Sequence, residues 1–253
     1  MTDVLVSRTG AVVELRLDRA SKKNAITPSM YGTLAAGLRD ARADATVRAA
    51  LLTAAGETFC AGNDIGDFLS RDAGGAVAPS AFIQALVDFD KPLVAAVQGP
   101  AVGIGATMLL HCDLVYASTT TRLRMPFVSL GLVPEAGSSY LLPRRVGEAV
   151  AAEILLLGAW IDAARAKELR LVNAVLASTD ELTAFARARA EELASSPPGA
   201  LRTTRALFRG DRGALRDRIA DEGRAFAECL TSPEAREALT AFLERRAPDF
   251  SKR

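Results

Sequence analysis

The sequence VQGPAVGIG, residues 97–105, decides the fold. An apolar run at 93–97 has the length of a buried strand, and residues 106–110 read as a helix that follows the glycines. A glycine-rich turn at the start of a helix leaves backbone N–H groups unpaired at the positive end of the helix dipole. Such a turn suits a developing negative oxygen, although close packing of a helix on a strand also calls for glycine.

A second stretch of small residues lies about forty residues earlier, in FCAGND at 59–64. It follows an apolar run at 47–53 and a short polar loop, and its small side chains let a ligand approach the backbone closely. The alternative is a tight turn that enters a helix, with Asp64 as the N-cap. Two such loops, each placed after a strand, are stronger evidence for a binding site than either loop alone.

Strands and helices alternate through the first half of the chain, which predicts an α/β core. The patterns predict strands at 4–6, 12–17, 47–53, 93–97 and 114–117, and helices at 27–44, 82–89, 148–157, 162–169, 180–194 and 211–230. The clearest break is SSPPG at 195–199. We therefore predict a core domain over residues 1–196 and a C-terminal helical appendage over residues 197–253.

Composition excludes several classes of protein. Apolar residues make up 49% of the 253 residues and charged residues 24%, as in an ordinary globular protein. The formal net charge of +1 gives no support to nucleic-acid binding. The three cysteines are too few and too far apart for a disulfide framework or a zinc site. No secretory signal or membrane-spanning run is recognised, so we predict a cytoplasmic protein.

The two loops together resemble the two signatures of the crotonase (enoyl-CoA hydratase/isomerase) superfamily. The resemblance covers essentially the whole chain, with KNAI at 23–26, GLVP at 131–134, and later landmarks at 157–158, 162–163 and 171–172. It implies a crotonase-like ββα spiral core, an acyl-CoA substrate, and no metal or cofactor apart from the coenzyme A of the substrate. It also implies a homotrimer or a dimer of trimers, with residues 197–253 serving in trimerisation or as a lid.

The resemblance also carries over the family's site residues by position. The two backbone amides that polarise the thioester carbonyl in the family correspond here to those of Asn63 and Ile104. The substrate-binding positions that it implies are Lys23, Ala25, Ala61, Gly62, Asp64, Ile65, Gly103, Phe127 and Val133. Arg19 and Lys22 are candidates for the CoA phosphates, although a solvated loop explains them equally well.

The hydratases of the superfamily resemble one another in having two glutamates. At the matching positions this sequence has Thr107 and Phe127, so both carboxylates are missing. Hydration needs one group that activates water and a matching proton donor near the α-carbon. Neither threonine nor phenylalanine supplies these functions.

Glu135 is the candidate base instead. It lies in PEAGSSY, residues 134–140, which is similar to a segment of the peroxisomal-type Δ3,Δ2-enoyl-CoA isomerases in which the glutamate is the single catalytic base. The alternative for Glu135 is a water-facing acid in the first turn of a helix, stabilised by the dipole. The resemblance favours isomerisation of a 3-enoyl-CoA to the conjugated 2-enoyl-CoA, with Phe127 and Val133 as an apolar wall that raises the glutamate pKa.

Two other functions stay open. One is an enoyl-CoA hydratase or another crotonase-type reaction. The other is a CoA-binding or RNA-binding relative without catalysis. The near-neutral net charge argues against RNA binding, and the presence of Glu135 argues against a protein without catalysis. His111 is the single histidine and is interpreted as a core residue, and Cys60 and Cys112 are interpreted as small apolar packing residues.

Overall fold

The computed structural model describes residues 3–64 and 77–251. Its strands are β1 (Val4–Thr9), β2 (Val12–Leu17), β3 (Ala49–Ala54), β4 (Leu93–Val97), β5 (Pro100–Val102), β6 (Leu114–Ser118), β7 (Arg122–Arg124), β8 (Ile161–Asp162) and β9 (Ala174–Leu176). Its α-helices are α1 (Pro28–Ala43), α3 (Val77–Asp88), α4 (Ile104–Thr107), α5 (Ser138–Val146), α6 (Glu148–Ala152), α7 (Ala163–Glu168), α8 (Thr179–Ser195), α9 (Pro198–Arg209), α10 (Gly213–Leu230) and α11 (Pro233–Leu243). Short 3₁₀ turns are η1 (Ala20–Lys22), η2 (Met108–His111) and η3 (Val128–Leu130), and η4 (Glu153–Leu157) is a π-helical turn.

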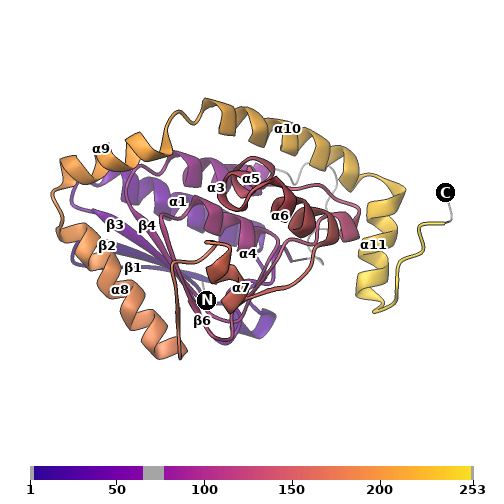
Figure 1. Ribbon diagram of the computed structural model, residues 1–253, viewed down its shortest axis with the longest axis horizontal. Helices are drawn as coiled ribbons and strands as arrows, with labels where there is room; N and C mark the ends of the chain where they lie inside the picture. Colours follow the sequence, from indigo (N-terminus) through magenta and orange to yellow (C-terminus); the bar gives the residue numbers. More distant parts are fainter. Residues whose placement is uncertain (1–2, 65–76, 252–253) are drawn as a thin grey trace.

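A six-stranded sheet in the order β1-β2-β3-β4-β6-β9 forms the centre of the molecule (Figure 1). Only the β1–β2 pair is antiparallel, and the other neighbours in the sheet run parallel. Strands β3 and β4 are almost completely buried, as expected for parallel strands that are covered on both faces. Continuous apolar runs therefore replace the alternating pattern in these two strands.

From β4 onward the chain repeats one pattern: a strand of the large sheet, a strand of a second, smaller sheet, and then a helix. After β4 of the large sheet comes β5 of a three-stranded sheet, followed by α4, and after β6 comes β7 of the small sheet, followed by η3 and α5. This repetition is the ββα spiral predicted from the sequence, and the α/β fold class is confirmed. The spiral brings the β5–α4 turn close to the segment between β7 and α5.

Helices cover the two faces of the large sheet for identifiable reasons. On α8, Leu182, Ala186 and Ala190 recur every four residues and form one buried stripe against β3 and β4. On the other side α1 packs against α3 and the sheet. Helix α1 begins where the Thr27 hydroxyl accepts a hydrogen bond from the Met30 amide, with Pro28 in the first turn.

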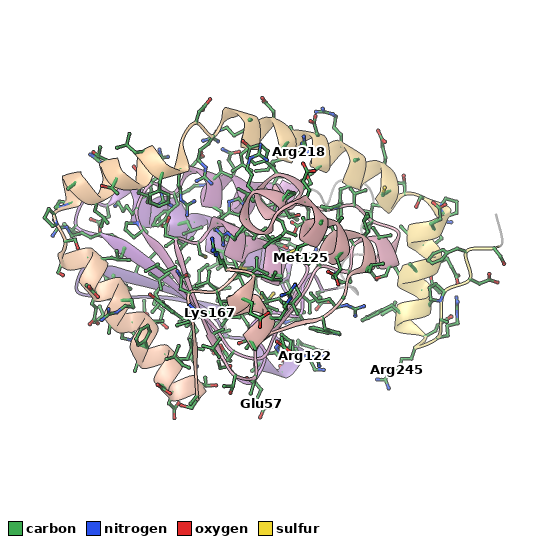
Figure 2. All side chains as sticks on the ribbon, in the orientation of Figure 1. Glu57, Arg122, Met125, Lys167, Arg218 and Arg245 are labelled. Carbon is green, nitrogen blue, oxygen red and sulfur yellow. The ribbon has the colours of Figure 1, made fainter. Side chains whose placement is uncertain are left out.

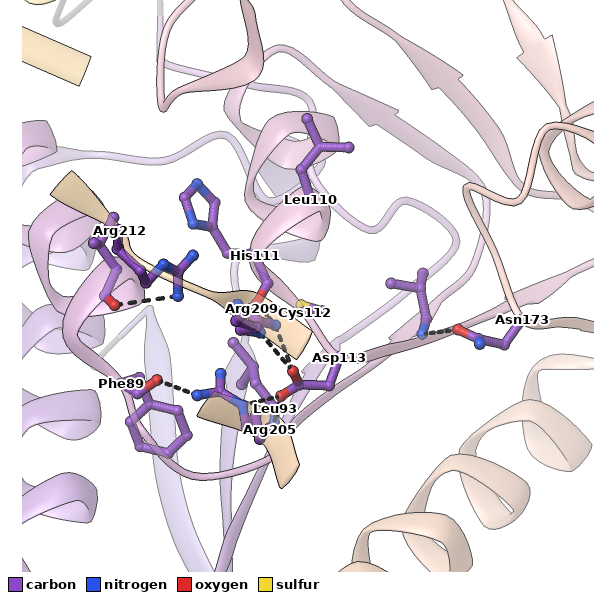
Figure 3. A network of polar contacts seen from close by, with 12 residues as sticks. Phe89, Leu93, Leu110, His111, Cys112, Asp113, Asn173, Arg205, Arg209 and Arg212 are labelled. Carbon is purple, nitrogen blue, oxygen red and sulfur yellow. Dashed lines mark hydrogen bonds and ion pairs between the residues drawn. The ribbon is translucent and has the colours of Figure 1, made fainter. Parts of the chain in front are cut away.

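The C-terminal helices α9, α10 and α11 run around the outer side of the core (Figure 1). Helix α9 is fixed by a buried cluster in which Arg205 and Arg209 converge on Asp113, with N–O distances of 2.8 and 2.5 Å (Figure 3). Asp113 also accepts a hydrogen bond from the Leu93 amide at the start of β4. Figure 2 contrasts Met125, which lies in the packed interior, with exposed Arg245 at the outer edge beyond α11.

Several elements differ from the sequence-based prediction. Helix α3 begins at Val77, five residues before the predicted start at 82, and ends at Asp88, one residue before the predicted end. Strands β5, β7, β8 and β9 and helices α5, α9 and α11 were not identified individually. The predicted boundary at 196/197 falls between α8 and α9. None of the helices within the described ranges is long and apolar enough to cross a membrane.

Candidate active site

The two small-residue loops lie side by side. Cys60 forms an isolated parallel bridge with Ala101 of β5, in which the Cys60 amide donates to Pro100 O and the Val102 amide donates to Cys60 O at 2.9 Å. Asn63 and Ile104 each follow three residues after this bridged pair. The register therefore carries both candidate amides to the same end of the paired segment.

Gly103 makes the turn from β5 into α4 possible. Its φ of 55° and ψ of −123° belong to a region that only glycine adopts readily. A Cβ placed on Gly103 would be 4.0 Å from Gly62 Cα, so the two loops are in contact distance at this point. Two of the predicted substrate-binding residues, Gly62 and Gly103, thus meet directly.

The amides of Asn63 and Ile104 are available as donors. Ile104 is the first residue of α4, where a helical N–H has no intrahelical partner. Within residues 3–64 and 77–251, neither of these two amides donates to another protein group. The Asn63 side chain is fixed separately, because its Oδ1 accepts a hydrogen bond of 2.7 Å from the hydroxyl of buried Tyr31.

The predicted CoA-contacting segment lies against the first loop. The Ala61 amide donates to Lys23 O at 3.0 Å, and the Ile26 amide donates to Gly62 O at 2.8 Å. Lys23 is exposed and Ala25 is half-buried. The structure thus brings together residues 23–26 and 61–64, whereas Ile65 lies outside the described residues.

Asp64 and Arg19 form an ion pair beside this segment. Their N–O distance is 2.6 Å, and Arg19 also lies 3.4 Å from Asp3 and donates to Ala25 O. The interpretation of Asp64 as a loop-forming residue fits this geometry. Arg19 is neutralised by two carboxylates of its own chain, which makes it a weaker candidate for a CoA phosphate than exposed Lys23.

Glu135 lies beside the start of α4. Its Oε1 accepts a hydrogen bond of 2.5 Å from the Thr107 hydroxyl, and Thr107 is one helical turn after Ile104. The first-turn alternative for Glu135 is wrong, because α5 begins three residues later and two positive-φ residues, Ala136 and Gly137, intervene. The glutamate therefore belongs to a bent loop that faces α4.

Glu135 is half-buried, and loss of contact with water makes it an unusual acid. Desolvation raises the pKa of Glu135 from 4.5 to about 8, against the opposing effect of the Thr107 hydrogen bond and with a further contribution from the Glu222 carboxylate. Burial likewise raises the pKa of the Cys60 thiol to about 12, and the charge of Glu135 adds to this shift. Glu135 thus interacts with Cys60 of the first loop and with Thr107 of α4 in a site of low water access. A carboxylate with a pKa near 8 in such a site can accept or return a proton near neutral pH.

Phe127 and Val133 lie on the segment that leads to Glu135. Phe127 is buried, and its carbonyl accepts hydrogen bonds from the amides of Leu130 and Leu132. Val133 is half-buried and two residues from the glutamate. Their role as an apolar wall for the substrate stays a prediction.

The core interpretation of His111 fits its surroundings. The ring is completely buried, and its Nε2 lies 2.7 Å from Ala136 O, a group that can only accept, so Nε2 carries the proton. Burial lowers the pKa of His111 to about 3, which keeps the ring neutral. Cys60 and Cys112 are buried free thiols, as the packing interpretation expects.

Sequence reasoning missed two partners of Glu135. Thr107 was noted only as the replacement of a family glutamate, although its hydroxyl donates a hydrogen bond to the Glu135 carboxylate. Glu222 on α10 is 85 residues after Gly137, to which it is bonded, and carries no sequence signal that separates it from other acids of an amphipathic helix. Two surface cavities of about 400 and 450 Å³ lie elsewhere, and neither is lined by Glu135, Asn63 or Ile104.

Comparisons with known proteins identify the family of the chain. The family model described as enoyl-CoA hydratase/isomerase matches residues 7–253. Enoyl-CoA delta isomerase 2 of Rattus norvegicus is 37% identical over 257 residues that cover 96% of this chain, which spans 64% of the length of the rat protein. The 2,3-dehydroadipyl-CoA hydratase of Escherichia coli (strain K12) is 32% identical over 257 residues, with 100% of each chain covered. A crystal structure of an enoyl-CoA hydratase/isomerase from Pseudoalteromonas atlantica T6c has a TM-score of 0.93 at 42% identity, and covers 98% of this chain and 100% of its own.

Proposed function

The chain belongs to the enoyl-CoA hydratase/isomerase family, and from this premise we propose that it isomerises a 3-enoyl-CoA to the conjugated 2-enoyl-CoA. The observation that carries the proposal is the carboxylate of Glu135, held by Thr107 one helical turn from the Ile104 amide. An isomerase of this kind needs one base that reaches two carbons, and no cofactor beyond the CoA of the substrate. A hydratase of the two-glutamate kind needs a second carboxylate.

The amides of Asn63 and Ile104 serve as the oxyanion hole in this mechanism. Both N–H groups are without a protein acceptor in the described chain, and the register of the two loops carries them to one place. Donation to the thioester oxygen stabilises the enolate that forms when C2 loses its proton. The loss of one such donor typically reduces the rate by ~10²–10³.

Glu135 performs both proton transfers. Its carboxylate takes a proton from C2, the electrons of that C–H bond form the C1=C2 bond of a dienolate, and the carbonyl electrons move onto the thioester oxygen. When the dienolate collapses, the C=O bond reforms, the C1=C2 electrons become the C2=C3 double bond, and the C3=C4 electrons bind the proton that is delivered to C4. The resulting carboxylic acid returns the proton to C4, so the enzyme ends in its starting state. A pKa near 8 suits this exchange, because the group is neither too weak a base nor too weak an acid near neutral pH.

Hydration is the second candidate, since the Escherichia coli relative carries a hydratase name. The residues at the two hydratase positions argue against it: Thr107 donates a hydrogen bond to Glu135, and Phe127 is an apolar buried side chain. Neither residue activates water. Any hydration therefore relies on Glu135 alone and is expected at trace rates.

Two substrates separate these functions. With a 3-enoyl-CoA, the absorbance of the conjugated enoyl thioester should rise with enzyme, and Glu135→Gln should reduce the rate by ~10²–10⁴. With crotonyl-CoA, the same absorbance band should hardly fall. Hydration of crotonyl-CoA at rates comparable to isomerisation, or isomerisation unaffected by Glu135→Gln, would contradict the proposal.

We also propose a homotrimer or a dimer of trimers, in which copies of this chain cover exposed apolar residues of the C-terminal helices. Leu207 and Phe208 at the end of α9 are 78% and 68% exposed, and Phe242 on α11 is 58% exposed. Leu207 and Phe208 are adjacent in the sequence, whereas α11 lies at the opposite end of the molecule (Figure 1), so the two helices offer separate exposed apolar sites that burial against a partner would stabilise. The native mass from light scattering tests this assembly, and a monomer at micromolar concentration would rule it out.

A further inference from the structure

The loop that carries Glu135 is held by a second glutamate from a distant helix. Glu222 on α10 accepts a hydrogen bond of 2.6 Å from the Gly137 amide at Oε2. At Oε1 it accepts from the amide and the hydroxyl of Ser139, at 2.9 and 2.5 Å. All three partners are donors, the pattern that an ionised carboxylate requires.

This carboxylate replaces a missing helix cap. Helix α5 begins at Ser138 after Gly137, and glycine has no side chain to accept the first amides of the helix. Glu222 is only 6% exposed, and among the described residues it forms no ion pair with lysine, arginine or histidine. Its negative charge is therefore balanced by the N–H groups and the positive end of α5.

Side chains of α10 pack directly against the backbone of this turn. A Cβ on Gly137 would lie 2.5 Å from Leu215 Cδ1, so the two elements are in direct contact where Glu222 binds. Ala136 is held by a second element, because the Nε2 of buried His111 donates to its carbonyl. The backbone directly after Glu135 is thus fixed both by α10 and by η2.

We propose that Glu222 is a positioning residue that presents the Glu135 carboxylate to α4 by holding the turn formed by residues 136–139. The inference rests on the proposed role of Glu135 as the catalytic base. It assigns to the C-terminal helices a task within the active site of their own chain. Removal of the three contacts lets the turn relax, and a displacement of about 1 Å can reduce the rate by about 10²-fold.

The two glutamates also interact through their charges. Among residues 3–64 and 77–251, the charged or titratable groups that interact with Glu135 are Glu222 from α10 and Cys60 from the first loop, while Thr107 contributes a neutral hydroxyl and His111 is uncharged. The negative charge of Glu222 raises the pKa of Glu135. Neutralising Glu222 should therefore lower that pKa and move the rise of kcat/KM to lower pH.

Four proteins test this proposal: the wild type, Glu222→Gln, Ser139→Ala and Glu228→Gln. Glu228 lies on the exposed side of the same helix and forms no side-chain hydrogen bond in the described chain, so its variant is the matched control. Glu222→Gln should reduce the high-pH plateau of kcat for the 3-enoyl-CoA by about 10- to 100-fold. It should also shift the rise of kcat/KM to lower pH and leave KM nearly unchanged.

Ser139→Ala keeps the charge and removes one contact, so it should lower kcat by a few fold, roughly as expected for one weakened support, with an unchanged pH profile. Glu228→Gln should match the wild type in every readout. If Glu222→Gln does not fold, Ser139→Ala still tests the support, and wild-type kcat in that variant would then overturn the proposal. A Glu222→Gln enzyme with a lowered plateau but an unshifted pH profile would show a structural role only and would overturn it as well.

A readout that does not need turnover separates this inference from the proposed function. The carboxylic acid C=O band of Glu135, identified as the infrared difference between the wild type and Glu135→Gln, reports the pKa of Glu135 directly. A lower midpoint in Glu222→Gln supports the coupling even if the substrate class is wrong, and an equal midpoint refutes it. Wild-type protein without any isomerase activity would refute the proposed function alone.

Discussion

Replacing Glu135 by glutamine should make the protein more stable while it abolishes the reaction. The pKa of Glu135 is raised from 4.5 to about 8 by burial, so folding favours the protonated form. Between these two values the folded chain holds a proton that the unfolded chain has lost, and stability therefore falls as pH rises. Above pH ~8 the full penalty applies, with an upper limit of about 5 kcal/mol at ~1.4 kcal/mol per pH unit.

Glutamine has nearly the same shape and is neutral at every pH, so Glu135→Gln escapes this penalty. Its free energy of unfolding should equal that of the wild type near pH 4 and exceed it increasingly up to pH ~9. Urea titrations of both proteins across this pH range measure the difference in free energy of unfolding. The Thr107 hydroxyl can donate a hydrogen bond to the side-chain oxygen of either glutamate or glutamine at position 135, so this contact does not distinguish the two proteins. Equal stabilities at pH 9, or a less stable glutamine variant, would refute the burial of an ionisable base at this position.

Two further variants probe the site and the attachment of the C-terminal region. Gly103→Ala should reduce activity by ~10²–10³, the effect of losing one oxyanion donor, because alanine does not readily adopt φ 55° with ψ −123°. The control is Gly32→Ala, at an open position on α1, which should leave kcat unchanged. Asp113→Ala should lower the free energy of unfolding by about 3–5 kcal/mol, because Arg205 and Arg209 lose their buried partner. The exposed pair of Arg224 and Asp221 is the control, and Arg224→Ala should change the free energy of unfolding by less than about 1 kcal/mol. Denaturant titrations measure both variants, and wild-type stability for Asp113→Ala would contradict the reasoning.

The features that could be predicted from the sequence are those governed by neighbouring residues. The glycine-rich turn at 97–105 and the following helix depend on local backbone preferences, and both are present in the structure. The buried strands at 93–97 and 114–117 follow from apolar runs of the right length. Crotonase membership, and with it the spiral fold, is confirmed by the match to residues 7–253.

The features that could not be predicted depend on contacts between distant residues. Strand β8 has two residues and exists only because β7 offers an edge for pairing. The bond between Glu222 and Gly137 spans 85 positions, and no local pattern marks either partner. The position of Glu135 before α5 was also missed, because the positive φ angles of Ala136 and Gly137 delay the start of the helix.

In the proposed mechanism, Thr107 lets one half-buried carboxylate serve as both base and acid. A hydroxyl can donate to the ionised form of Glu135 and accept from the protonated form, so the Thr107–Glu135 pair, 2.5 Å apart in this structure, can form a hydrogen bond in either state. A lysine or arginine there would stabilise only the ionised form and would lower the pKa of Glu135 far below the working pH. A second carboxylate would instead provide the partner that hydration requires. In the proposed mechanism the neutral threonine therefore leaves the proton free to move between C2 and C4, while Glu222 and His111 hold the adjoining backbone through the Gly137 amide and the Ala136 carbonyl.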